Sequence, residues 1–132
     1  MANASDKVRR NLEEWYGSQK DFEMMSAQIL AMEGYSSVDP IHPLGGRDGG
    51  KDALAWKNDQ LWGMAVAFWR SRQSFSEIRR KFVHDHDGIQ KNNVQGMVFV
   101  TNQHITAQQR IQLQDLTSIE VDILHLERLV ML

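Results

Sequence analysis

Three carboxylates stand at positions from which they could hold a divalent metal ion. Glu23 lies in a segment with helical periodicity, Asp48 inside a glycine-rich stretch, and Asp52 where that stretch leads into a strand. Mg²⁺ takes oxygen ligands and keeps several waters, so carboxylates converging from a helix and a hairpin suit it. A metal bound there can activate water and offset the charge of a phosphodiester under attack. The same residues also fit a solvated helix carboxylate and two turn aspartates.

Basic residues follow the longest apolar strand of the sequence and continue into the next helix. They are Arg70, Arg72, Arg79, Arg80 and Lys81. Arg47 and Lys51 add two cations from the glycine-rich stretch. Such a cluster is typical of a surface that holds a phosphate backbone. The alternative is a solvated helix face, and the sequence leaves both interpretations open.

Several other chemistries are excluded by what the sequence lacks. The chain has no cysteine, which rules out disulfides, Cys-ligated zinc, iron–sulfur clusters and thiol nucleophiles. His84 and His86 are two residues apart in a predicted helix, so they point in different directions and are expected to be exposed rather than to share a metal. No P-loop or Gly-x-Ser-x-Gly motif is present, and the glycine-rich stretch precedes a strand, unlike a dinucleotide-binding loop.

The composition is that of a globular protein of one domain. The chain has 132 residues, of which 42% are hydrophobic and 24% charged, with a net charge of −2. That charge argues against a dedicated polybasic nucleic-acid binder. No apolar run approaches the roughly 20 residues of a membrane helix, and the N-terminus has no signal-peptide core. We therefore expect a soluble, cytoplasmic domain without a membrane partner, and the apolar end LERLVML suggests that it was excised from a longer protein.

Periodicity and capping residues predict how the elements are ordered. Helices are expected at 5–16, capped by Ser5, at 19–33, ended by Gly34, and from Ser74 onward. A further helix should begin at a Thr106–Gln109 capping box and bury Ile111 and Leu113, and a last helix is expected at 125–132. The second helix should bury a stripe of Phe22, Met25, Ile29 and Met32. Strands are expected at 35–41, at 52–56 and 61–70 as a hairpin, and at 95–101 and 119–124. Strand and helix alternate twice after the hairpin, which favours parallel strands. The sequence thus predicts an α/β domain: an N-terminal helical segment (1–17), then a core (18–132) with a mixed sheet of about five strands flanked by helices.

The order of these elements and motifs resembles a known nuclease family. Phe22-Glu23 near a helix start and Gly34-Tyr35 after its end are followed by the segment GGRDGGKD (45–52). The motif GMVFVT (96–101) and the sequence HLERL (125–129) come later in the same order. The chain resembles the Mrr-like branch of the restriction-endonuclease-like (PD-(D/E)XK) nucleases from about residue 19 onward. The resemblance implies a restriction-endonuclease-like core.

The resemblance also implies roles for individual residues. Asp52 would be the metal-binding aspartate of the hairpin, Glu23 the helix carboxylate that supports it, and Asp48 a residue that shapes the loop or an alternative ligand. The family has Gln/Glu-x-Lys on the second hairpin strand, where this chain has the apolar residues 64–69 (MAVAFW). The missing cation could come from Lys51, Arg70, Arg72 or Lys81.

Two functions follow as expectations. The first is a DNA endonuclease domain that uses Mg²⁺ or Mn²⁺, the effector module of an antiviral defence or DNA-processing protein. The second is a catalytically inactive module of the same fold that binds nucleic acid or protein, or forms an oligomer. The glycine-rich loop favours the first, and the absent Gln/Glu-x-Lys favours the second. DNA is the expected partner, beside a second copy of the chain or other domains of a longer protein.

Overall fold

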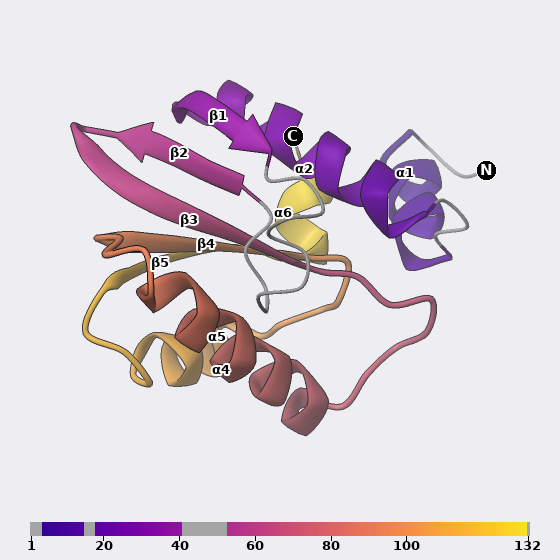
Figure 1. The fold of residues 1–132 in the computed structure, drawn as a ribbon. Coiled ribbons are helices and arrows are strands. Elements are labelled where there is room, and N and C mark those ends of the chain that lie inside the picture. The colour runs from indigo at the N-terminus through magenta and orange to yellow at the C-terminus, as the bar shows by residue number, and fades with distance from the viewer. Residues whose placement is uncertain (1–3, 15–17, 41–52, 132) are drawn as a thin grey trace.

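Strand β3 (Gln60–Ala67) is the central strand of a five-stranded sheet with the order β1-β2-β3-β4-β5. The computed structural model describes residues 4–14, 18–40 and 53–131. The other strands are β1 (Ser36–Pro40), β2 (Ala53–Lys57), β4 (Gly96–Thr101) and β5 (Glu120–Leu124). The helices of the described residues are α1 (Ala4–Glu13), α2 (Gln19–Met32), α4 (Phe75–Gln90), α5 (Ala107–Gln114) and α6 (Leu126–Val130). Figure 1 shows α2 and α4 covering opposite faces of the sheet, which confirms the predicted α/β architecture.

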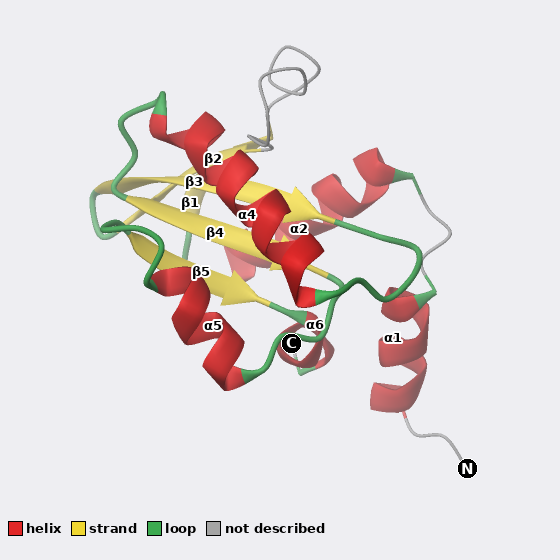
Figure 2. Ribbon diagram, turned by 90° about the horizontal axis from the view of Figure 1, so that it is seen from below, coloured by secondary structure: helices red, strands yellow, loops and turns green. Residues whose placement is uncertain are grey.

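The sheet is mixed because its two halves are connected differently. β1, β2 and β3 are antiparallel neighbours, and β3, β4 and β5 are parallel. The β2–β3 turn uses Asn58 and Asp59 at φ 52° and 63°, the left-handed backbone that two-residue hairpins require. Helices α4 and α5 form the crossovers between the parallel strands (Figure 2), as such connections demand. The predicted hairpin and parallel pairs are confirmed, although β3 ends three residues before the predicted 61–70.

Each face of the sheet has its own apolar core. Met64 and Val66 of β3 belong to the core with α1, α2 and α6. Ala65 and Ala67 belong to the core with α4 and α5. All residues of β3 from 62 to 67 are buried, as expected for a central strand that is apolar on both faces.

Some of the local sequence predictions were wrong. Helix α1 begins at Ala4, so Ser5 lies inside the helix and does not cap it. Met32 is 72% exposed and Ile111 is 56% exposed, although both were expected in the core. By contrast, Thr106 and Gln109 form the predicted capping box of α5. Gly34 has φ 95° directly after α2, as a helix-ending glycine requires.

We expect Gly96→Ala to lower the free energy of unfolding by about 2 kcal/mol, because overpacking a filled core costs about that much. Gly96 pairs with Trp62 across β3 and β4, and a methyl group at Gly96 would overlap the Trp62 ring. Urea unfolding of both proteins measures the difference. The loss should shrink in a Trp62→Leu background; an equal loss in both backgrounds would contradict this explanation.

Candidate active site at the carboxyl end of the central strand

The start of α2, which carries Glu23, lies against the carboxyl end of β3. The Phe22 ring is 5.1 Å from the ring of Phe68, the residue directly after β3. Ser18 caps the helix by accepting a hydrogen bond from the backbone N–H of Asp21 at 3.0 Å. Glu23 is partly exposed beside the buried Phe22. The capped first turn therefore holds Glu23 near the end of the sheet where parallel strands usually bind ligands.

Strand β2 begins next to the second half of β3. Ala53, the first residue of β2, pairs with Met64. The hairpin entrance and the start of α2 therefore approach the same end of β3. Arg47, Asp48, Lys51 and Asp52 lie outside the described residues, so their placement in the site remains a prediction.

Strand β3 contributes only packing to this region. Met64 and Val66 are fully enclosed on the α2 face, and Ala65 and Ala67 are equally enclosed on the α4 face. Gln60 is the only polar side chain of the strand, and it lies in the pair that closes the hairpin. Strand β3 therefore has no acid or lysine to offer near the carboxylates predicted from the sequence.

Helix α4 carries an ion pair between Lys81 and the buried Asp85. Sequence analysis singled out Lys81 but not Asp85. Lys81 Nζ lies 3.0 Å from Asp85 Oδ1, and the Asp85 side chain is 0% exposed. Asp85 Oδ2 is buried, and none of the described residues forms a hydrogen bond with it. Burial raises the pKa of the Asp85 carboxyl, although the Lys81 ammonium opposes that shift. The sequence did contain a signal for the burial of Asp85, because this residue lies between Phe82 and Ile89 on the apolar stripe of α4.

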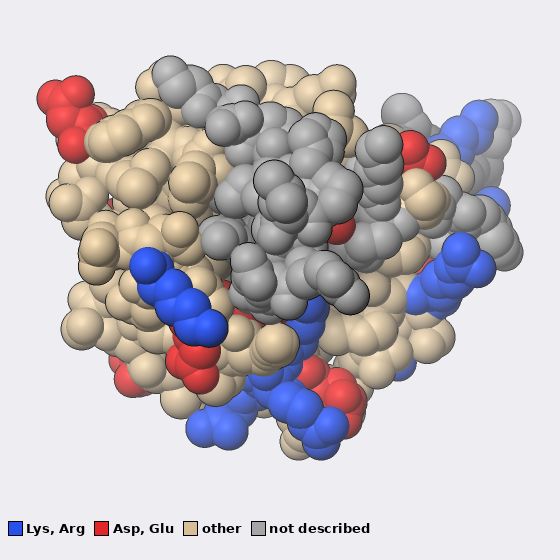
Figure 3. All heavy atoms as spheres, viewed as in Figure 1, with Lys and Arg blue, Asp and Glu red and all other residues tan. Residues whose placement is uncertain are grey.

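The predicted basic residues are placed in two groups. Arg70 and Arg72 are exposed in the segment after β3, while Arg79 and Arg80 are exposed on the outer side of α4. Arg80 pairs with Glu77 at 3.2 Å, whereas Lys81 is turned inward to Asp85. Figure 3 shows basic side chains interspersed with acidic ones along the lower edge, in the direction of α4. The surface is mixed in charge rather than uniformly basic.

Two amides after β4 fix the segment that follows β3. Asn102 Nδ2 donates to the backbone oxygens of Leu12 and Trp69 at 2.8 and 2.6 Å, and its Oδ1 accepts from Trp69 N–H at 3.1 Å. Gln103 accepts from the Gln73 N–H at 2.7 Å and donates to the Ser71 oxygen at 3.1 Å. Sequence analysis missed both amides, although they directly follow the GMVFVT motif. They hold the backbone that carries Arg70 and Arg72.

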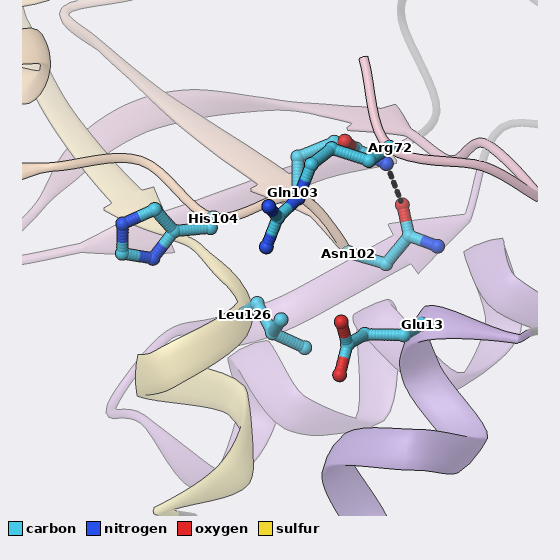
Figure 4. A pocket seen from close by; sticks show the side chains of 6 residues that line it. All are labelled: Glu13, Arg72, Asn102, Gln103, His104 and Leu126. Atoms are coloured by element: carbon cyan, nitrogen blue, oxygen red, sulfur yellow. Dashed lines mark hydrogen bonds between the residues drawn. The ribbon is translucent and has the colours of Figure 1, made fainter.

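A small polar pocket opens beside these amides. Its volume is about 80 Å³, and it is lined by Glu13, Arg72, Asn102, Gln103, His104 and Leu126. Figure 4 shows the hydrogen bond from Gln103 to Asn102 along its wall. The pocket is large enough for a few water molecules but too small for a nucleotide. Among the described residues, no group of three or more histidines and acidic residues is arranged to hold a metal ion.

The histidines differ in their surroundings. His84 is exposed as expected, but the expectation for His86 was wrong, because its side chain is 16% exposed and lies 2.7 Å from Thr117 Oγ1. His125 is buried, and its Nε2 lies 3.0 Å from Nη1 of Arg110. A guanidinium can only donate, so Nε2 accepts and the imidazole is neutral. Burial and the neighbouring Arg110 lower the pKa of His125.

We expect the free energy of unfolding to fall as the pH drops below about 6.5, the pKa of an unfolded histidine. The folded state disfavours the His125 imidazolium, so the unfolded chain binds the extra proton. Glu127 and His104 also face this group, but the Glu127 carboxyl, whose pKa lies below its usual value, titrates at lower pH. Urea unfolding between about pH 8 and pH 5.5 measures the slope, which cannot exceed about 1.4 kcal/mol per pH unit for one group. His125→Gln should flatten it; an unchanged slope in that variant would contradict the assignment.

Comparison with known proteins identifies the family of the chain. A family model described as a restriction endonuclease (Mrr_cat) matches residues 17–132. The chain belongs to this family. No curated protein matches the chain. The Mrr-type assignment confirms the resemblance read from the sequence and agrees with the mixed α/β core seen in the structure.

The Mrr-type match spans both elements that approach the carboxyl end of β3. It begins before α2, which carries Glu23, and includes the whole β2–β3 hairpin. Helix α1 precedes the match and contacts α6, where Arg9 Nη1 lies 2.9 Å from Glu127 Oε2. In the part of the chain that the structure describes, every helix is too short or too polar to cross a membrane.

Proposed function

We propose that this nuclease-like module is a Mg²⁺-dependent DNA endonuclease domain, the effector of a defence or DNA-processing protein. The observation that carries the proposal is the match to the restriction endonuclease family over residues 17–132. The placement of Glu23 near the hairpin entrance supports it, because both predicted metal-binding elements approach one end of the sheet.

The available donors fit Mg²⁺ or Mn²⁺. Glu23 offers a partly exposed carboxylate, a hard oxygen ligand of the kind both ions prefer. Glu23 and Asp52 would hold the ion, and Asp48 would shape the loop or act as an alternative ligand. A bound ion lowers the pKa of a coordinated water and offsets charge on the phosphate.

The basic residues would hold the DNA. Arg47 and Lys51 from the loop and Arg70 and Arg72 after β3 would contact phosphates near the cleavage site. Arg79 and Arg80, exposed on α4, would contact the backbone further along. Each phosphate contact that is formed releases counterions, so DNA affinity should fall steeply with salt.

Calorimetric titration of Mn²⁺ and Mg²⁺ into the wild type, the single variants Asp52→Asn and Glu23→Gln, and the double variant tests the proposal. We expect saturable binding to the wild type and loss of that binding in the Asp52→Asn, Glu23→Gln double variant. Asp59→Asn in the β2–β3 turn is the control and should bind like the wild type. Absence of metal binding to folded wild-type protein would refute the metal-dependent nuclease.

A second function is favoured by one specific observation, the apolar β3. A module without an acid or a lysine on this strand could bind DNA, a second copy of the chain or another domain without cutting. Salt-dependent DNA binding with no cleavage of supercoiled plasmid in Mn²⁺ would favour this function. Cleavage that disappears in Asp52→Asn would exclude it.

A further inference from the structure

Helix α1 lies outside the residues that match the nuclease family, and its attachment to the core is slight. Among its side chains that the structure describes, only Leu12 is buried, whereas Val8 is 41% exposed. Two polar contacts add to this anchor: Arg9 pairs with Glu127 of α6 at 2.9 Å, and Asn102 Nδ2 donates to the Leu12 oxygen at 2.8 Å. A helix of about ten residues is marginal in water without tertiary contacts. Elements with few buried apolar contacts open more readily than the rest of a fold.

The end of α1 lies beside the basic segment that follows β3. Asn102 Nδ2 donates both to a backbone oxygen of α1 and to the oxygen of Trp69, at 2.8 and 2.6 Å, and Trp69 directly precedes Arg70. Glu13, the last residue of α1, lines the small polar pocket together with Arg72. Figure 4 shows the Glu13 side chain entering this pocket from α1. Helix α1 therefore covers one side of the segment that is proposed to contact DNA.

The charges at the end of α1 oppose the preference of a helix. Glu13 ends the helix and Glu14 follows it, and both are exposed. The carboxyl end of a helix carries a partial negative charge, so acids there are unfavourable and cations are preferred. Arg10 is the only cation of the last turn. Arg72 across the pocket supplies a further positive charge, which favours the docked position of these acids.

We propose that α1 is a strap that covers the segment 70–72 in the free protein and detaches when DNA binds there. This inference rests on the proposed function, because the strap controls access to basic residues of that site. In the docked position, Glu13 and Glu14 place negative charge where DNA phosphates would lie. DNA binding then requires the contacts of Leu12 and Arg9 to open. The apparent affinity for DNA is therefore lowered by the fraction of molecules in which α1 is detached.

A reversible cross-link between α1 and α6 tests the strap in the full chain. The chain has no cysteine, so an Arg9→Cys, Glu127→Cys variant carries only the two introduced thiols. The native side chains meet at 2.9 Å, so a short bismaleimide can bridge the two positions, and a disulfide within its linker lets a reductant release it. The affinity for a labelled DNA duplex, measured by fluorescence anisotropy, should fall by at least about tenfold on cross-linking and recover after reduction. The same variant treated with N-ethylmaleimide is the control, because both thiols are modified without a bridge.

The acids at the end of α1 are tested separately with the variant Glu13→Gln, Glu14→Gln. The amides keep the size of the side chains and remove the charge that competes with phosphates, so DNA affinity should rise by about twofold to fivefold, the size of an exposed charge interaction. The variant Asp59→Asn, Asp115→Asn removes the same charge at exposed positions before β3 and β5, and it measures the effect of net charge alone. Thermal melting checks that each variant is folded.

The outcomes separate the strap from the proposed function. Equal DNA affinity of the cross-linked and the released protein would overturn the strap and leave the proposed function standing. Higher affinity after cross-linking would also overturn it and would make docked α1 part of the DNA-binding surface. Because anisotropy measures binding without cleavage, a protein that binds DNA more weakly when cross-linked but never cleaves it would support the strap and refute the endonuclease. A wild type and a released variant that bind no DNA would overturn both.

Discussion

Replacing Phe99 by alanine should lower the free energy of unfolding by about 4 kcal/mol, the range for a buried phenylalanine. Phe99 is fully buried in β4 and packs edge-on against Phe82 of α4 at 5.3 Å. Its neighbours across the sheet are Ala65 and Ile123. Because the methyl side chain of Ala65 cannot extend into the space, the cavity should stay open and the loss should reach about 4 kcal/mol.

Urea unfolding of Phe99→Ala and of the wild type measures this effect. The control is Ile111→Ala on α5, a large apolar side chain that is 56% exposed. The control should change stability by less than about 1 kcal/mol. A loss below about 1.5 kcal/mol in Phe99→Ala would mean that α4 and α5, which cover this core, move in and close the cavity.

The fold could be predicted from the sequence wherever local signals decide it. The hairpin turn, the capping box of α5 and the helix-ending glycine of α2 each act over a few residues, and each was confirmed. Burial was predicted less well. Ile111 and Leu113 are two residues apart, so a helix points them about 200° apart and only one can face the sheet. The buried residue is Leu113.

The sequence predicts the candidate site only as a set of carboxylates and cations, and of the carboxylates only Glu23 lies within the described residues. Asp85 was missed because the charges of α4 suggested a polar face, whereas its burial depends on how the helix is rotated over β3. The His86 contact joins residues 31 positions apart, and the Asn102 contact to Leu12 joins residues 90 positions apart. No periodicity or local motif reports such contacts, since they exist only after the layers have packed.

At neutral pH, we expect Asn102→Asp to lower the free energy of unfolding about as much as the loss of a core aromatic ring does. The amide nitrogen of Asn102 donates to two backbone oxygens, of Leu12 and Trp69, at 2.8 and 2.6 Å. A carboxylate places a second acceptor against those two oxygens and puts a negative charge at a buried position. Such a charge costs about 3–5 kcal/mol. The amide oxygen position would still accept from Trp69 N–H.

The pH dependence of this variant distinguishes a buried charge from a simple loss of packing. Burial should raise the pKa of the introduced carboxyl above its unfolded value of about 3.9, so the folded state binds the extra proton and stability is lost as the pH rises. The protonated carboxyl can again donate to one backbone oxygen. The difference in unfolding free energy between variant and wild type should therefore be smaller at about pH 5 than at about pH 8, by up to about 1.4 kcal/mol per unit. Asn102→Ala introduces no titrating group, so its difference from the wild type should be the same at both pH values. An equal, pH-independent loss in both variants would show that the hydrogen bonds of Asn102, and not the exclusion of charge, hold the segment after β3 in place.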